Sequence, residues 1–288
     1  MKISGFTFVR NAVKYDYPVV ESIRSILSVC DEFIVAVGNS DDGTRNLIAS
    51  IGSPKIKIID TVWDDSKRHG GLVLSDETNK AMDSISPDST WAFYLQADEV
   101  VHEKYLDSIY QAMDRHHGDI EVEGLLFNYL HFYGSYDFVG DSRQWYRNEV
   151  RIIRNDPRIR SYRDAQGFRK NNRKLRVMPS GGYIYHYGWV KPPEFQQAKQ
   201  ESFHRYWHDD RWIERNIPES DGFDYSDIDS LSRFDGNHPE VIQDRIHQKN
   251  WHFDFDPSKK KFSLIARFLH LLERKTGWRP GEYKNYKI

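Results

Sequence analysis

Cysteine is almost absent from this chain: Cys30 is the single one in 288 residues. One cysteine cannot build an internal disulfide framework, which excludes the class of small disulfide-stapled secreted domains and fits a reducing compartment. The sequence also lacks an apolar run long enough to cross a bilayer. Its first residues do not have the basic and then apolar pattern of a signal peptide. We therefore expect a soluble, cytoplasmic protein.

An excess of charge of one sign is missing as well. The chain has 41 Lys and Arg against 43 Asp and Glu, for a net charge of −2. A nearly neutral chain gives no electrostatic reason to expect nucleic acid as a partner. Aromatic residues, in contrast, make up 14% of the sequence. Aromatic side chains with polar tips often line sugar and nucleotide sites, although a rigid core would use them too.

The first half of the chain alternates strand and helix patterns. Short apolar runs predict buried strands, and apolar residues spaced by three and four predict helices packed against them. Alternation of this kind indicates parallel strands joined by right-handed crossovers. The expected strands cover residues 3–9, 33–37, 55–59 and 91–95, and the expected helices cover 17–29, 44–51 and 75–85.

The pattern changes after residue 124, where strands are separated by loops rich in Arg, Asp and Gly. A chain of this length suits one large α/β domain with an appendage. We expect an α/β domain over 1–190, with a mostly parallel but mixed sheet flanked by helices, and a C-terminal helical and loop extension over 191–288. Its elements are expected strands at 125–132, 150–154 and 183–187 and expected helices at 192–207 and 257–277.

The segment 91–100 places two carboxylates at the end of an expected buried strand. In an open parallel sheet, ligands bind in the crevice at the carboxyl ends of the strands. Asp98 and Glu99 stand at such an end, and a carboxylate there can hold a divalent metal against a phosphate. The alternative is that Asp98, Glu99 and Glu103 are acidic residues in the first turn of a helix over 105–113.

In this order of elements, the chain resembles family 2 glycosyltransferases of the GT-A type. Three pieces carry the resemblance: Thr7-Phe8-Val9-Arg10-Asn11 after the first strand, Asn39-Ser40-Asp41-Asp42-Gly43-Thr44 after the second, and Gln96-Ala97-Asp98-Glu99 after the fourth. The resemblance implies a nucleotide-binding half over 1–115 and an acceptor half over 116–190. It also implies a nucleotide sugar, with a UDP-sugar foremost, held by Phe8, Arg10, Asn39, Asp42, Asn79 and Gln96.

The third piece resembles the Asp-x-Asp metal motif of the family, with Asp98 as the metal ligand. Gln96 stands at the first Asp of that motif, and a glutamine can bond a ribose hydroxyl but adds no negative charge. The second piece departs too, because Gly38 and Asn39 follow the strand where the family often has an Asp. The resemblance supports His186 as a second ligand of Mn²⁺ or Mg²⁺. Its alternative is a histidine packed among aromatic side chains.

Sugar transfer with inversion needs a general base for the acceptor hydroxyl. Asp164 follows the strand at 150–154 at a spacing that the family allows, and Glu149 is the reserve. Both could instead pair with neighbouring arginines, as exposed carboxylates commonly do. The basic cluster over 151–176 is open to two interpretations, phosphate contacts or a solvated basic loop.

The resemblance implies transfer to a saccharide or lipid-linked acceptor, in polysaccharide or glycolipid synthesis. The last helix has a basic start and a broad apolar face over 259–272, which could rest on a membrane surface or pack on the domain. A sugar-phosphate nucleotidyltransferase is the second function considered, but it should carry a glycine-rich phosphate loop and 10–14 contains no glycine. A non-catalytic nucleotide-sugar-binding protein is the third, and Gln96 favours it.

Overall fold

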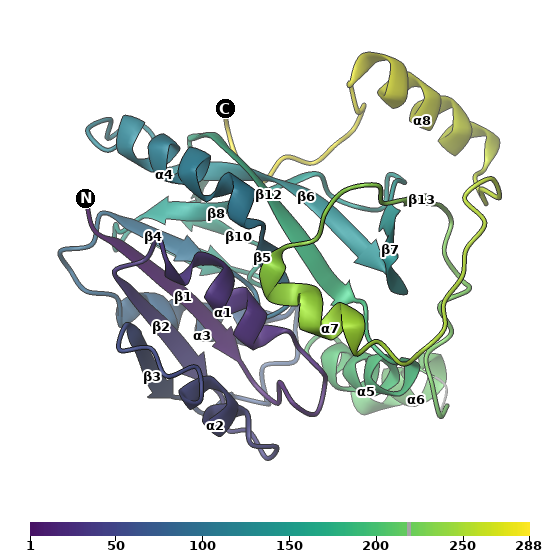
Figure 1. Cartoon of the computed structure of the whole chain (residues 1–288), viewed down its shortest axis with the longest axis horizontal. Coiled ribbons are helices and arrows are strands. Elements are labelled where there is room, and N and C mark those ends of the chain that lie inside the picture. The colour runs from purple at the N-terminus through teal and green to yellow at the C-terminus, as the bar shows by residue number, and fades with distance from the viewer. Residues whose placement is uncertain (218–219) are drawn as a thin grey trace.

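A ten-stranded mixed sheet with helices against it forms the centre of the computed structural model, which describes residues 1–217 and 220–288 (Figure 1). The strand order is β13-β7-β6-β8-β4-β1-β2-β3, with β12 beside β6 and β5 beside β12. The strands are β1 (Ile3–Val9), β2 (Glu32–Val37), β3 (Ile56–Asp60), β4 (Trp91–Tyr94), β5 (Glu99–Val101), β6 (Gly124–Tyr133), β7 (Ser135–Gly140), β8 (Asn148–Arg154), β12 (Val177–Trp189) and β13 (Leu231–Arg233).

A three-stranded antiparallel sheet and eight α-helices complete the described chain. The small sheet contains β9 (Ile159–Tyr162), β10 (Gly167–Lys170) and β11 (Arg173–Lys174). The helices are α1 (Val19–Leu27), α2 (Thr44–Ala49), α3 (Leu72–Asp83), α4 (Leu106–Arg115), α5 (Pro193–His204), α6 (Asp210–Asn216), α7 (Gln243–His247) and α8 (Leu264–Thr276), with 3-10 turns at Glu103–Tyr105 and Glu240–Ile242.

Seven strands of the large sheet run in one direction, β13 among them because it is antiparallel to β7, which is antiparallel to β6. β1 pairs in parallel with β2 and β4, and β2 pairs in parallel with β3. β8 is antiparallel to both β4 and β6, so β6 and its parallel neighbour β12 run the same way as β4. The carboxyl ends of β1, β2, β3, β4, β6 and β12 therefore meet at one edge of the sheet.

Apolar side chains cover both faces of this sheet. On one face Val35 and Phe93 pack with residues of α1 and α4, and on the other Ile34 and Tyr94 pack with Ala81 of α3 and with the small sheet. Parallel strands that are buried on both faces need nearly continuous apolar sequences, and all four residues of β4 are buried. This is the α/β fold class expected from the sequence, with strands and helices where the periodicity predicts them.

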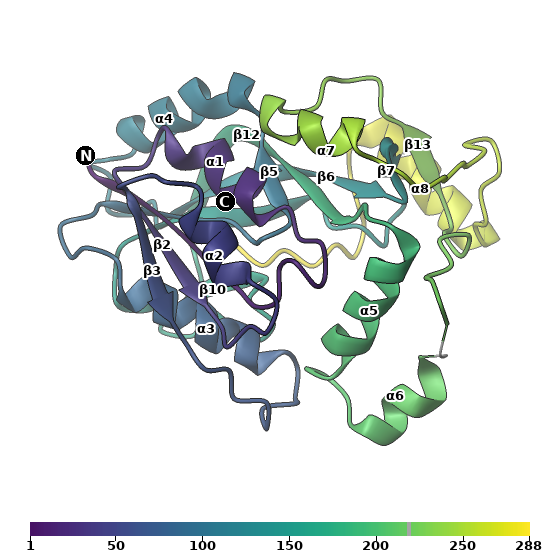
Figure 2. The same ribbon diagram turned by 60° about the horizontal axis from the view of Figure 1, so that its bottom comes forward.

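The C-terminal residues return to the large sheet. β13 pairs with β7, the carbonyl of Lys287 accepts from the N–H of Val177, and Tyr286 is buried in the core with Phe168. α5 and α6 follow β12 and extend away from the sheet (Figure 2). A boundary at residue 190 stays a prediction, while residues on both sides of it share one core. In the part of the chain that the structure describes, no helix has the length and apolar character to cross a membrane.

Candidate functional site

A cavity of about 230 Å³ lies at the carboxyl ends of β1 and β4. The strand order reverses between these two neighbours, since β2 and β3 lie beyond β1 while β8 and β6 lie beyond β4. Such a switch point is where open α/β sheets form their ligand crevice. The cavity brings together six of the residues selected from the sequence: Phe8, Arg10, Gln96, Asp98, Asp164 and His186.

Asp98 is held at the cavity by a tight turn after β4. The N–H of Glu99 donates to the Gln96 carbonyl, and the Glu99 carboxylate accepts from the N–H of Gln96 at 3.0 Å. The N–H of Tyr187 in β12 donates to the Asp98 carbonyl at 2.8 Å. These backbone contacts fix the Asp98 carboxylate between the ends of β4 and β12.

Glu99 turns the other way, into the core. Its two oxygens accept from Nε and Nη2 of Arg151, both at 2.7 Å, and one also accepts from the Tyr129 hydroxyl at 2.8 Å. Both charged side chains are fully buried. The interpretation of Asp98 and Glu99 as the first turn of a helix is wrong, because β5 begins at Glu99, whereas Glu103 does lie in the 3-10 turn Glu103–Tyr105 that leads into α4.

The hydrogen bonds around His186 fix which of its ring nitrogens carries the proton. Nε2 of His131 lies 2.8 Å from the Tyr146 carbonyl and must donate to it. Burial lowers the pKa of His131 well below its usual range, so its Nδ1 is an acceptor at neutral pH. This Nδ1 lies 3.2 Å from Nδ1 of His186, which must be the donor. Since burial also lowers the pKa of His186, its Nε2 carries a free lone pair.

This lone pair faces the carboxylate of Asp98. Nε2 of His186 lies 3.7 Å from Oδ1 of Asp98. Burial would raise the pKa of Asp98, but the positive charge of Lys199 holds it well below its usual range. An ionised carboxylate and an unprotonated imidazole nitrogen therefore face each other with no hydrogen between them.

Gly188 keeps the space beside these two groups open. A Cβ atom at this position would lie 2.7 Å from both Oδ2 of Asp98 and Nε2 of His186, so any larger residue would fill the gap. Lys199 of α5 bounds the same space. Its ammonium donates to Oδ2 of Asp98 at 3.1 Å and to the Gly188 carbonyl at 2.9 Å.

The Asp98 carboxylate and the Nε2 lone pair of His186 fit a divalent cation that has two protein ligands. Mn²⁺ accepts carboxylate and imidazole, and the bond from Nδ1 of His186 to His131 is the outer contact that typically orients a metal-binding histidine. Within residues 1–217 and 220–288, no group of three or more His, Cys, Asp or Glu side chains could hold a metal ion. A cation at Asp98 and His186 would therefore take its other ligands from phosphate oxygens and water.

Phe8, Trp63 and Tyr206 contribute aromatic rings to the lining of the cavity. The rings of Phe8 and Trp63 are 5.7 Å apart, and those of Trp63 and Tyr206 are 5.5 Å apart. The Arg10 guanidinium lies 5.6 Å from the Trp63 ring and pairs with Asp65 at 2.6 Å. The indole N–H of Trp63 is buried without a hydrogen-bond partner. Flat rings and an unused donor are suited to a base or a sugar.

α5 supplies a wall that we did not expect from the sequence. Gln196 is fully buried, and neither its amide oxygen nor its amide nitrogen has a hydrogen-bond partner. Gln196, Lys199, Gln200, Phe203 and Tyr206 all line the cavity. Gln196, Lys199, Gln200 and Phe203 share one face of α5 by their spacing of three and four, and Tyr206 follows the end of the helix. Buried polar groups without partners are rare in proteins, which points to a ligand here.

Asp164 reaches the cavity from the loop between β9 and β10. Its neighbours Arg163 and Ala165 have φ values of 57° and 60°. The left-handed region is costly for residues other than glycine, and such strain concentrates at functional sites. In the described part of the chain, the Asp164 carboxylate has neither a hydrogen bond nor an ion pair. Of the four arginines considered as its partners, three bond other residues: Arg147 bonds Glu282, Arg151 bonds Glu99 and Arg169 bonds Tyr162 and Tyr283. The fourth, Arg163, lies over the Tyr162 ring.

Three residues expected at the nucleotide support the site without lining the cavity. Asn39 accepts from the N–H of Trp63 at 3.2 Å and so positions that ring. Asp42 accepts from the N–H and hydroxyl of Thr44 at the start of α2. The Asn79 amide exchanges two hydrogen bonds with the backbone of Ser161, which ties α3 to β9. As the sequence predicts, the loop at 39–44 lies at the same sheet edge as Asp98.

Glu149 does not line the cavity either. It lies on β8, is almost fully buried, and has an unpartnered Oε2. Burial is the largest influence on its carboxyl group and raises its pKa to about 7. A carboxyl group of this kind is suited to proton transfer near neutral pH, but it has no direct contact with the space where a substrate would bind.

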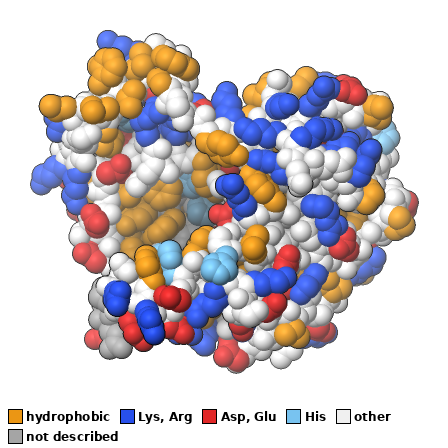
Figure 3. Space-filling model, turned by 180° about the vertical axis from the view of Figure 1, so that it is seen from behind, with side chains coloured by type: hydrophobic (Ala, Val, Ile, Leu, Met, Phe, Trp, Pro, Cys, Tyr) orange, Lys and Arg blue, Asp and Glu red, His pale blue; other side chains and the backbone are white. Residues whose placement is uncertain are grey.

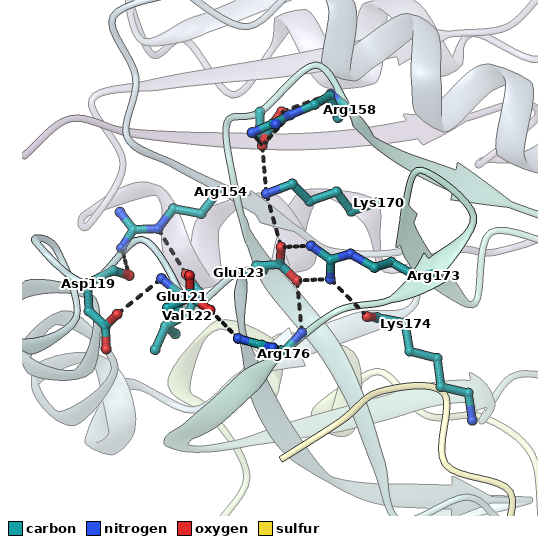
Figure 4. A network of polar contacts seen from close by, with 11 residues as sticks. Asp119, Glu121, Val122, Glu123, Arg154, Arg158, Lys170, Arg173, Lys174 and Arg176 are labelled. Carbon is teal, nitrogen blue, oxygen red and sulfur yellow. Dashed lines mark hydrogen bonds and ion pairs between the residues drawn. The ribbon is translucent and has the colours of Figure 1, made fainter.

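Many basic side chains over 151–176 make internal contacts, and Figure 4 shows part of this network. Glu123 accepts from both Nη atoms of Arg173 and pairs with Lys170 at 3.0 Å. Burial would raise the pKa of Glu123, but these partners lower it to about 2. Arg154 donates to backbone carbonyls, including that of Val122 at 3.0 Å. This network lies at the beginning of β6, and none of its residues lines the cavity.

No protein-family model matches the chain, and no curated protein matches it. S. aureus TarS 1-349 in complex with UDP is 16% identical over 70% of this chain and 64% of that chain, with a TM-score of 0.41. Glucosyl-3-phosphoglycerate synthase from Mycobacterium tuberculosis with Mn²⁺, UDP and phosphoglyceric acid is 13% identical over 45% and 43%, with a TM-score of 0.31. 4-Diphosphocytidyl-2C-methyl-D-erythritol synthase from Anaerococcus prevotii is 10% identical over 54% and 70%, with a TM-score of 0.33.

The chain spans between 34% and 64% of the TarS chains that it matches. Every one of these TM-scores lies below 0.5. Likenesses of this size leave the donor and the reaction of this chain open.

Proposed function

We propose that this chain is a glycosyltransferase that moves a sugar from a nucleotide-diphosphate donor, a UDP-sugar foremost, to an acceptor hydroxyl. The observation that carries this proposal is the composition of one cavity at the strand switch point. There the Asp98–His186 pair, the Lys199 ammonium and the unpaired Asp164 carboxylate meet. Positive charge for a leaving diphosphate and a base for an incoming hydroxyl are the two requirements of this reaction.

Two parts of the cavity suit the two ends of the donor. The rings of Phe8, Trp63 and Tyr206 would receive the base, and Gln96 would bond a ribose hydroxyl. The diphosphate would then lie toward Asp98 and His186. When bound there, Mn²⁺ or Mg²⁺ supplies positive charge to the diphosphate as it leaves.

Lys199 adds a positive charge that belongs to the chain itself. Its ammonium is 3.1 Å from Asp98 and points to the same part of the cavity. It would donate hydrogen bonds to the phosphate oxygens and so stabilise the developing charge. Gln196, whose amide has no protein partner, would bond hydroxyl groups of the transferred sugar.

In the transfer step, an acceptor oxygen attacks the anomeric carbon while the bond from that carbon to the diphosphate oxygen breaks. The hydroxyl proton passes to the Asp164 carboxylate. Attack from the side opposite the leaving group inverts the anomeric centre. The acceptor is a saccharide or a lipid-linked hydroxyl, in polysaccharide or glycolipid synthesis.

The two other functions have less support. A nucleotidyltransferase would need backbone N–H groups of a glycine-rich loop to surround the phosphates. Here Asn11 follows Arg10 after β1, its N–H donates to Ser40 and its side chain accepts from the N–H of Asp41. A binding protein without catalysis would have no need for the unpaired Asp164 carboxylate between two residues in the left-handed conformation.

Release of the nucleotide from a panel of nucleotide sugars, measured with Mn²⁺ present, tests the proposal. We expect slow hydrolysis of one donor class, which the Asp98→Asn variant loses. The matched control is Asp88→Asn, which removes an exposed carboxylate paired with Lys2 at the opposite edge of the sheet. If no nucleotide sugar is hydrolysed and none binds, the proposal is wrong.

A further inference from the structure

An apolar strip on the outer side of α8 has no partner in the described structure. Leu264, Ile265, Phe268 and Leu271 are 83%, 74%, 64% and 52% exposed. No residue of this helix is buried. Monomeric soluble proteins rarely expose a contiguous group of large apolar side chains unless something binds it.

Helix geometry places these four residues together. At 100° per residue, they fall within an arc of about 120° on one side of the helix. Arg267 and Arg274 are seven residues apart and lie together along the border of this arc. Trp278, which is 62% exposed, follows the end of the helix. An apolar strip bordered by arginines and followed by a tryptophan is the arrangement of helices that lie in a membrane interface.

The exposed charge around the strip is positive. Residues 259–278 contain six Lys and Arg but a single acidic residue, Glu273. Glu273 faces inward, where it pairs with Arg143 at 3.1 Å and with Arg279 at 2.8 Å. Arg267, Arg274 and Lys275 are exposed and have no ion-pair partner among the described residues. The outer side of α8 therefore combines apolar side chains with uncompensated positive charge (Figure 3).

The helix is nevertheless firmly attached to the protein. Ser263 caps its first turn by accepting from the N–H of Ala266, and Gly277 ends it in the left-handed conformation. Arg143 donates to Glu273 on its inner side at 3.1 Å, and Arg147 lies 3.6 Å from the same carboxylate. α8 projects at the periphery, away from β1 to β3 (Figure 1). A preordered helix loses little conformational entropy when its outer side binds a surface.

We propose that α8 docks this protein on membranes of anionic lipid, with its apolar strip in the headgroup region and Arg267, Arg274 and Lys275 against lipid phosphates. A second copy of the chain is the competing occupant. Pairing two apolar strips would bring the bordering arginines of both copies together, and like charges in an interface are unfavourable. An anionic membrane surface can bury the apolar strip and also pair with the positive charges that border it.

Cosedimentation with vesicles tests this proposal independently of any transfer activity. We expect binding to vesicles of phosphatidylcholine mixed with phosphatidylglycerol, at least about tenfold weaker binding to phosphatidylcholine alone, and weaker binding at high salt. The double variant Ile265→Glu with Phe268→Glu should lose at least about 90% of the binding, because it places charge in the strip. Both positions are exposed, so the circular dichroism spectrum should be unchanged.

The matched control is Ile120→Glu, which changes an exposed isoleucine outside α8. It should bind as the unmodified protein does. Equal binding of the control and the double variant, or no preference for anionic vesicles, would overturn the proposal. It would also be overturned by sedimentation velocity showing a dimer that the double variant converts to a monomer, since a second copy would then cover the strip.

Discussion

Nδ1 of His131 lies 3.2 Å from Nδ1 of His186, and this contact leaves Nε2 of His186 unprotonated toward Asp98. The Tyr146 carbonyl accepts from Nε2 of His131 and so fixes the proton of His131 on that nitrogen. One buried carbonyl thus determines, through two rings, that a lone pair faces the carboxylate. The proton arrangement of this site is built into the ends of β6 and β12 before any ligand arrives.

His131 is therefore expected to act through His186. The His131→Phe variant keeps a ring in the aromatic surroundings but removes the acceptor for Nδ1 of His186. Outer contacts of this type change metal affinity by roughly 10–100-fold, so Mn²⁺ should bind about that much more weakly. Mn²⁺ titration followed by electron paramagnetic resonance measures it. If the affinity is unchanged and folding is intact, His186 is not a metal ligand oriented by His131.

The Asp164→Asn variant tests the base. It keeps the shape and polarity of the side chain but loses its basicity, so transfer should fall by roughly two to four orders of magnitude. Donor affinity should persist, because the base acts on the acceptor. Turnover and nucleotide affinity are measured on the same variant, beside Glu149→Gln as its control. Loss of turnover in Glu149→Gln alone would move the role of the base to Glu149.

Replacing Gln196 should raise the stability of the protein and weaken its binding of the donor. Gln196→Met keeps the length of the side chain and removes an amide that is buried without a partner. An unpaired buried amide costs about 1–3 kcal/mol, so the free energy of unfolding should rise by a part of this amount while donor binding weakens roughly tenfold. Urea unfolding and calorimetry measure the two quantities. Gln197→Met is the matched control, since Gln197 is bonded to Glu201, and it should lower stability without weakening binding.

Glu149 should make stability depend on pH. Burial raises its pKa from 4.5 to about 7, so folding favours the protonated form. The resulting stabilisation is fully present below the unfolded pKa and is lost as the pH rises through about 7. Relative to Glu149→Gln, the unmodified protein should lose up to about 3 kcal/mol of unfolding free energy between pH 4.5 and pH 8. Urea unfolding across this range measures it, and parallel curves for the two proteins would contradict the assignment.

Local patterns in the sequence were enough to place one end of the site. Phe8 and Arg10 stand at the end of β1, and Gln96 and Asp98 follow β4. Parallel strands end at the same edge, so the proximity of these residues follows from the strand order. Asp164 was selected by its spacing. Its unpaired carboxylate could not be foreseen, because arginines such as Arg151, which bonds Glu99, find their partners only in the folded chain.

The part of the cavity lined by α5 could not be predicted from local sequence patterns, because it depends on tertiary contacts. Lys199 meets Asp98 across 101 positions of the chain, and nothing in the local sequence of either residue encodes this contact. Asn79 illustrates the reverse case. Its place on the helix before β4 implied a contact with the nucleotide. In the structure its amide bonds the backbone of Ser161 in β9. The exposed side of α8 also differs from the usual rule that an apolar stripe faces a core.

Calorimetric titration with UDP, with and without Mn²⁺, tests most directly whether this cavity is a metal-assisted donor site. We expect the unmodified protein to bind UDP more tightly with Mn²⁺ and the Asp98→Asn variant to lose that gain. The loss should exceed roughly 100-fold in metal-dependent affinity, because even outer-shell changes cost 10–100-fold. Equal UDP affinity in both proteins, with Mn²⁺ making no difference to either, would contradict the account.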